Sequence, residues 1–177
     1  MEQVHPWGVT PTRSDAGGEG HSRRRRRTVN LGRGLVVPYP EPASQAATNV
    51  ARGNRRTNTR PEVLIRSALH RRGLRFRKDH LLRVGGVRVR PDLAFTRWKV
   101  AAFVDGCFWH RCPDHSTTPS RNPDYWIPKL QANVERDRRV DGALMSEGWV
   151  VIRVWEHENV DAAATRIETV VRRQGRP

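Results

Sequence analysis

Apolar positions along this chain recur with a helical period in three stretches, which predict three helices. The stretches cover residues 61–70, 124–147 and 161–173. Apolar side chains four residues apart lie on one face of a helix, so each stretch has a face to bury. Gly73 and Gly148 end the first two helices, and Pro128 is expected to kink the second. The repeats that carry the pattern are Leu64/Ala68, Ile65/Leu69, Leu130/Val134 and Val140/Leu144.

Shorter apolar runs between the helices predict strands. Gly85 and Gly86 separate two of these runs and indicate a hairpin. The run at 149–155, which reads WVVIRVW, is typical of a buried strand. This order of elements predicts an α/β fold, a mixed central sheet flanked by helices. The predicted strands cover residues 74–77, 81–84, 87–89, 90–95, 99–104 and 149–155.

Neither period is present before residue 45. Residues 1–44 are rich in Gly, Pro, Ser and Arg, and we expect a disordered basic tail there, with one domain over 45–177. The Arg23–Arg27 block is open to two interpretations, a solvated run or a phosphate tether. A spurious upstream start codon would leave it without meaning. Residues 45–58 are expected to form a flexible basic lead-in that touches DNA.

Charge indicates the kind of partner. The net charge is +15 and the pI about 11.5, which favours a polyanion such as nucleic acid. Most of the positive charge is Arg, whose planar fork suits phosphate and guanine, although a G+C-rich genome also enriches Arg. No apolar run is long enough for a signal peptide or a membrane span. We expect a cytoplasmic, nucleoid-associated protein that does not bind membranes and is a monomer.

Candidate chemistry is densest over residues 100–115, which read VAAFVDGCFWHRCPDH. Within four positions stand a thiol (Cys107), two large rings (Phe108 and Trp109) and an imidazole (His110). A plain hydrophobic core has no use for that combination, whereas an active site needs exposed rings and a base. We therefore interpret this stretch as the functional centre.

Two cysteines are too few for a disulfide framework and have the spacing of metal ligands. Cys107, Cys112 and His115 resemble the ligand spacing of structural zinc sites, and His157, just after the last predicted strand, is the candidate fourth ligand. The alternative is two small buried hydrophobic residues and two unrelated histidines. The spacing alone leaves both open.

Two acids are further candidates. Asp92 interrupts an apolar run, where an unpartnered carboxylate is costly to bury, so it is either an edge acid paired with an Arg or a metal ligand. Hard oxygen ligands of this kind suit Mg²⁺. Glu62 stands three residues after Thr59 with capping-box spacing, and it either caps the helix or faces the site.

Five sequence blocks together resemble the very-short-patch repair endonucleases, which nick DNA beside T:G mismatches. The similarity covers residues 54–158, and G-C-F-W-H is its most specific part. Members of that family have a restriction-endonuclease-like fold but lack its usual lysine, as does the segment 104–106 here. The blocks are P-E-x-L-I-R-S-x-L-H, P-D-L-A-F, V-D-G-C-F-W-H-x-C-P-x-H, N-x-E-R-D-R-R and G-W-x-V-x-x-V-W-E.

The resemblance implies a role for each matched position. Asp92 falls on the Mg²⁺-binding aspartate and His110 on the general base. Glu62 and Asp137 match acids that hold metal-bound waters. Phe108 and Trp109 match the aromatic wedge that enters DNA beside the mismatch. The structural zinc cluster falls on Cys107, Cys112 and His115.

This chain departs from the family at three positions. Members often have Thr at 104 and His at 105, where this chain has Val104 and Asp105. Val104 still offers a backbone carbonyl to Mg²⁺, and Asp105 is either an added ligand or a charge that repels phosphate. The family's last zinc ligand is usually Cys in V-W-E-C, and His157 stands there instead, which we interpret as retention of the site.

Three functions compete at this stage. The first is a Mg²⁺-dependent endonuclease that nicks 5′ to the mispaired T left by deamination of 5-methylcytosine. The second is a related restriction-type nuclease acting on duplex DNA. The third is a zinc-stabilised DNA-binding module with weak or absent chemistry. The first implies a cytosine-5 methyltransferase as a functional link and mismatch-repair proteins and a DNA polymerase as partners.

Overall fold

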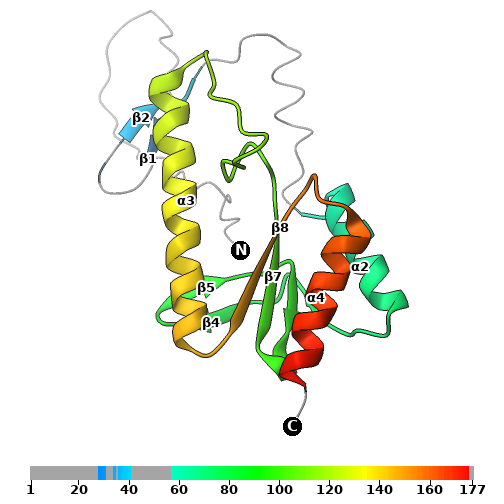
Figure 1. Cartoon of the computed structure of the whole chain (residues 1–177). Coiled ribbons are helices and arrows are strands. Elements are labelled where there is room, and N and C mark those ends of the chain that lie inside the picture. Colours follow the sequence, from blue (N-terminus) through cyan, green and yellow to red (C-terminus); the bar gives the residue numbers. More distant parts are fainter. Residues whose placement is uncertain (1–27, 31–33, 35, 41–56, 176–177) are drawn as a thin grey trace, which may run out of the picture.

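The computed structural model describes residues 28–30, 34, 36–40 and 57–175 (Figure 1). From residue 60 onward, one helix is followed by five strands, a second helix, one strand and a third helix. No helix in these ranges is long and apolar enough to cross a bilayer. The helices are α2 (Arg60–Arg71), α3 (Pro123–Ser146) and α4 (Val160–Gln174), and a 3₁₀ turn spans Thr96–Trp98. The strands are β1 (Thr28–Asn30), β2 (Val36–Pro38), β3 (Arg77–Lys78), β4 (Leu82–Val84), β5 (Val87–Val89), β6 (Leu93–Phe95), β7 (Val100–Asp105) and β8 (Val150–Trp155).

A mixed four-stranded sheet forms the centre, in the order β3-β6-β7-β8. β6 and β7 pair antiparallel with Leu93 opposite Ala102, whereas β7 and β8 pair parallel. Helices α2 and α4 lie on one side of this sheet and α3 on the other (Figure 1). The predicted mixed sheet flanked by helices is therefore confirmed.

Two buried clusters fill the spaces between these layers. The larger one joins α2 and α4 to the sheet and includes Leu69, Phe95 and Ile167. The smaller one joins α3 to the other sheet face and to the β4–β5 hairpin, and it includes Val140 and Leu144. Alternate β7 side chains pack into one cluster or the other, because successive residues of a strand point to opposite faces. The site described below depends on that alternation.

The predicted elements agree with the structure except at three places. The strand expected over 90–95 begins only at Leu93. The strand expected over 74–77 is confined to Arg77–Lys78, because Leu74 is buried in the cluster next to α2. Within the segment expected to be a disordered tail, β1 and β2 pair antiparallel, with Val29 only 5 % exposed. The β-branched residues of TVN and VVP favour a strand. The prediction of disorder rested on the composition of the whole segment and overlooked these two short runs.

The other residues of that tail, including Arg23–Arg27, lie outside the described residues. So do residues 45–56 of the expected lead-in. The proposed boundary between residues 44 and 45 stays a prediction.

Candidate active site

Asp92 lies where β6 begins and β7 ends. The antiparallel register brings these strand ends together, and the Val104 amide donates to Asp92 Oδ2 at 2.7 Å. Burial raises the pKa of Asp92 to about 7; the amide hydrogen bond opposes this rise, and the charges of Glu62 and Asp105 add to it. A buried acid with such a pKa is stabilised in its charged form by a cation.

Glu62 combines the two roles that the sequence left open. Its carboxylate is 3 % exposed and accepts the Asn58 amide at 2.8 Å and the Thr59 hydroxyl at 2.9 Å. It therefore caps the start of α2, although Thr59 returns no side-chain hydrogen bond to the helix. The same charge acts on Asp92, so Glu62 also belongs to the environment of the site.

His110 and Asp137 form a hydrogen-bonded pair across 27 positions of sequence. His110 Nδ1 lies 2.6 Å from Asp137 Oδ2, on the loop after β7 and on α3 respectively. Burial alone would raise the pKa of Asp137, but the hydrogen bond to His110 and the charges of His110, Arg153 and Arg136 outweigh it, and the pKa is lowered. An Nδ1–H that donates to Asp137 leaves Nε2 with a free lone pair, as a general base requires.

Asp105 is engaged by an arginine that the sequence analysis did not single out. Arg153 of β8 donates from Nη1 to both Asp105 carboxylate oxygens, at 2.9 and 2.7 Å. It also donates from Nε and Nη2 to Asp141 of α3, at 3.0 and 2.9 Å. Asp105 is thus an internal ion-pair partner, only 4 % exposed. The one available signal was the lone charge inside the buried run WVVIRVW.

The candidate residues around Asp92 and His110 form a continuous set. Asp105 lies between the two centres: Oδ1 is 3.7 Å from His110 Nδ1, and its charge raises the pKa of Asp92. The carboxylates of Glu62, Asp92, Asp105 and Asp137 therefore share one end of the sheet with the His110 imidazole.

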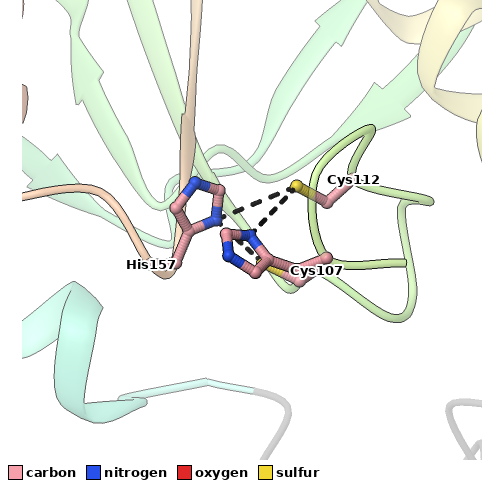
Figure 2. Close-up of side chains that lie close together, drawn as sticks. Cys107, Cys112 and His157 are labelled. Atoms are coloured by element: carbon pink, nitrogen blue, oxygen red, sulfur yellow. Dashed lines mark hydrogen bonds between the residues drawn. The ribbon is translucent and has the colours of Figure 1, made fainter. Parts of the chain in front are cut away.

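The four expected zinc ligands come together. Ligand atoms of Cys107, Cys112, His115 and His157 all lie within 4.8 Å of one another. Figure 2 shows that Cys107, Cys112 and His157 converge, with His157 coming from the chain after β8. Cys107 Sγ is 3.0 Å from His157 Nδ1. The structure thus favours a metal site over two unrelated thiols.

The chemistry of this donor set fits zinc. Two thiols and two imidazoles are the ligands of closed tetrahedral zinc sites. Burial and the neighbouring Cys112 thiol raise the pKa of Cys107 to about 11, so the cluster holds a thiolate poorly without a cation. Hydrogen bonds already fold the loop: the Cys112 amide donates to the Cys107 carbonyl at 2.9 Å, and the Cys107 amide donates to the Glu156 carboxylate at 2.7 Å.

Phe108 and Trp109 lie beside a third ring that the sequence analysis missed. Trp126, in the first turns of α3, has its ring centroid 5.5 Å from that of Phe108 and 5.9 Å from that of Trp109. The three rings, which we call the aromatic trio, are partly exposed and lie outside both buried clusters. Asn133 Nδ2 of α3 donates to the Trp109 carbonyl at 3.2 Å and ties the loop to the helix.

Comparisons with known proteins identify the family of this chain. The family described as DNA mismatch endonuclease Vsr matches residues 43–116. Type II nicking enzyme V.NaeI of Lentzea aerocolonigenes is 53 % identical over 134 residues, which are 75 % of this chain and 81 % of that protein.

Two further relatives have lower identity to this chain. Type II nicking enzyme V.XorIIP of Xanthomonas oryzae is 43 % identical over 114 residues, 62 % of this chain and 79 % of that protein. DNA mismatch endonuclease Vsr of Escherichia coli K12 is 35 % identical over 100 residues, 56 % of this chain and 62 % of its own length. This chain therefore belongs to the Vsr DNA mismatch endonuclease family and is a DNA nicking endonuclease.

Proposed function

We propose that this endonuclease hydrolyses one phosphodiester bond at the sheet edge that carries Asp92 and His110. The observation that carries the proposal is the 2.6 Å bond between His110 Nδ1 and Asp137 Oδ2. Asp137 holds the imidazole in one orientation, and Nε2 takes the proton of the attacking water. Asp137 remains ionised and stabilises the imidazolium that results.

The donors at Asp92 fit Mg²⁺. When bound, Mg²⁺ supplies stabilisation of negative charge on the scissile phosphate. Asp92 offers a carboxylate oxygen, and Val104 offers its carbonyl. The amide and carbonyl of one strand residue point to the same side, so the bond from the Val104 amide to Asp92 supports a carbonyl directed there too. Glu62 and Asp105 add negative charge that favours a cation.

We further propose that zinc holds Cys107, Cys112, His115 and His157. Cys107 and Cys112 flank the segment that carries Phe108, Trp109 and His110, so a metal bound to both fixes the two ends of that segment. A fixed loop keeps the rings at the surface and the imidazole against Asp137.

A T:G mismatch is the substrate that the geometry supports best. The aromatic trio presents partly exposed rings beside His110, and such rings can enter a base step that is already poorly stacked. A wobble pair opens at a lower cost than a Watson–Crick pair. We propose that the nick falls 5′ to the mispaired T, which links this enzyme to a cytosine-5 methyltransferase and to mismatch-repair proteins and a DNA polymerase.

Nicking of a fully paired recognition sequence is the second candidate, and the names of the relatives favour it more directly. V.NaeI and V.XorIIP are both called type II nicking enzymes, a name that mentions no mismatch. We do not propose the third interpretation, a binding module without chemistry, because the family relationship makes this chain an enzyme.

A nicking assay with Mg²⁺ separates the two substrates. Duplexes of identical sequence carry T:G, T:A or C:G at one position, with varied flanks. The mismatch proposal predicts that T:G is cut at least about 100-fold faster, because a paired step resists opening by a few kcal/mol. Equal cutting of all three duplexes would reject mismatch recognition and support a paired recognition sequence.

A further inference from the structure

We propose that Arg153 is a positioning residue for the nicking reaction. Its guanidinium ties Asp105 of β7 and Asp141 of α3 together and thereby fixes the His110–Asp137 pair that lies between these elements. This inference rests on the proposed role of His110 as the general base.

The position of Arg153 follows from the parallel pairing of β7 and β8. The register sets Arg153 opposite Phe103, and its guanidinium lies over that ring at 4.8 Å. Phe103 and Asp105 are two positions apart on β7 and therefore share a face of the sheet. That face is covered by α3, which brings Asp137 and Asp141 to the same guanidinium on successive turns.

The N–H groups of Arg153 donate hydrogen bonds to carboxylates of its own chain. An arginine has five N–H donors. Nη1 contacts both oxygens of Asp105, and Nε and Nη2 contact the two oxygens of Asp141. Nη2 also lies 3.7 Å from Asp137 Oδ1. The guanidinium thus contacts carboxylates of its own chain through Nε, Nη1 and Nη2.

Charge explains what the guanidinium does there. Three carboxylates, of Asp105, Asp137 and Asp141, surround it. Arg136 supplies a second cation at 3.1 Å from Asp137 Oδ1. Without Arg153, the buried Asp105 carboxylate would lie unpaired within 3.7 Å of His110 and compete with Asp137 for its Nδ1–H. An imidazole turned toward Asp105 would aim Nε2 away from the water it must deprotonate.

The test is Arg153→Met against a matched control, Arg72→Met. The two arginines have similar side-chain exposure, 24 % and 25 %, and each pairs with more than one carboxylate. Arg72 joins α2 to α4, on the side of the sheet opposite α3 (Figure 1). The steady-state constants kcat and KM for DNA, and the thermal stability, are measured on the full chain.

We expect Arg153→Met to lower kcat by about 10- to 100-fold, as misplaced catalytic groups do, with KM changed by less than about threefold. Arg72→Met should lose less stability, because its partner Asp161 is 80 % exposed, and should keep kcat within about twofold. A kcat loss no greater than that of Arg72→Met would overturn the proposal. A rise in KM at unchanged kcat would do the same, because it would make Arg153 a DNA contact.

Two further variants keep the inference testable if Arg153→Met folds poorly. Asp141→Asn keeps the shape of the partner, and it should lower kcat by about three- to tenfold at unchanged KM. Asp105→Asn added to Arg153→Met should restore part of kcat, because it removes the unpaired charge; a double variant as slow as the single one would contradict the mechanism. His110→Ala separates the two proposals, since normal nicking by that variant would remove the general base itself.

Discussion

The buried carboxylate of Asp92 lowers the stability of the folded protein when it is ionised. A buried acid whose pKa is raised to about 7 costs free energy whenever it is ionised. Its raised pKa comes from burial first and from neighbouring negative charge second, both of which a bound cation would offset. Residues held in this way are common at catalytic centres.

Replacement of Asp92 by Asn should stabilise the metal-free protein above pH 7. The folded-state pKa of about 7 lies above the ordinary value of 3.8, so the folded state holds an extra proton between these values. Wild-type stability therefore falls as pH rises through this window. We expect Asp92→Asn to gain about 1–3 kcal/mol at about pH 8 and little at about pH 4.

Urea unfolding in EDTA at both pH values measures this difference. Glu147→Gln, at an exposed residue that follows α3, serves as the control and should show no such pH dependence. A variant at Asp92 that is less stable than wild type at high pH would contradict the account of the buried charge.

At the scale of the element, the loop after β7 is held at several points. Backbone bonds close it between Cys107 and Cys112, Asn133 ties it to α3, and the thiols and imidazoles meet at one centre. The carbonyl and ring contacts fix where Trp109 and His110 lie relative to α3. The loop therefore behaves as a rigid part of the site only while these ties hold.

Loss of one thiol should release this loop. We expect Cys112→Ser to lose bound zinc and to lower the melting temperature by several degrees, because metal binding contributes folding free energy. Metal content by mass spectrometry and thermal unfolding check both effects. Ser120→Ala, on an exposed nearby loop residue, is the control. Unchanged zinc content in Cys112→Ser would rule out the proposed cluster.

Trp126 should matter for mismatch binding and little for folding. We expect Trp126→Leu to weaken binding to T:G duplex by about 5- to 30-fold, from the loss of about 1–2 kcal/mol of stacking. Trp98→Leu, at the other end of β6, should leave binding within about twofold. Equal binding by wild type and Trp126→Leu would exclude this ring from the DNA contact.

Periodicity was enough to predict α2, α3, α4 and most strands, because each buries a continuous apolar face. The ligands Cys107 and His157 were predictable because the strands that precede them lie side by side. Arg153 and Trp126 were not, since their roles depend on contacts with α3 and the loop that no local pattern encodes. The β1–β2 pairing was hidden for a different reason, the polar composition around it.

At the scale of the whole molecule, the two faces of the sheet have separate tasks. The side covered by α2 and α4 holds the larger buried cluster. The side covered by α3 holds the smaller cluster and, at the ends of β7 and β8, Asp105, Arg153 and their acid partners. The chain carries a net charge of +15, whereas the site is itself rich in carboxylates. We therefore expect affinity for DNA and hydrolysis to depend on different residues.

This separation predicts a salt effect on binding alone. Phosphate contacts by Arg and Lys release counterions, so we expect KM to rise by at least about tenfold between about 50 and 200 mM salt. The single-turnover rate at saturating DNA should stay within about threefold, because the pairs around His110 are partly buried. A rate that falls as steeply as affinity would show that the site's internal ion pairs are screened as well.

The central claim is that Asp92 and His110 act on the same phosphodiester. The most direct measurement is the single-turnover nicking rate of Asp92→Asn and His110→Ala at saturating DNA and Mg²⁺, beside His70→Ala, at an exposed residue of α2, as control. We predict a loss of at least about 100-fold for each of the first two variants, with DNA binding retained, and no loss for the third. Nicking at the wild-type rate by either Asp92→Asn or His110→Ala would contradict the account.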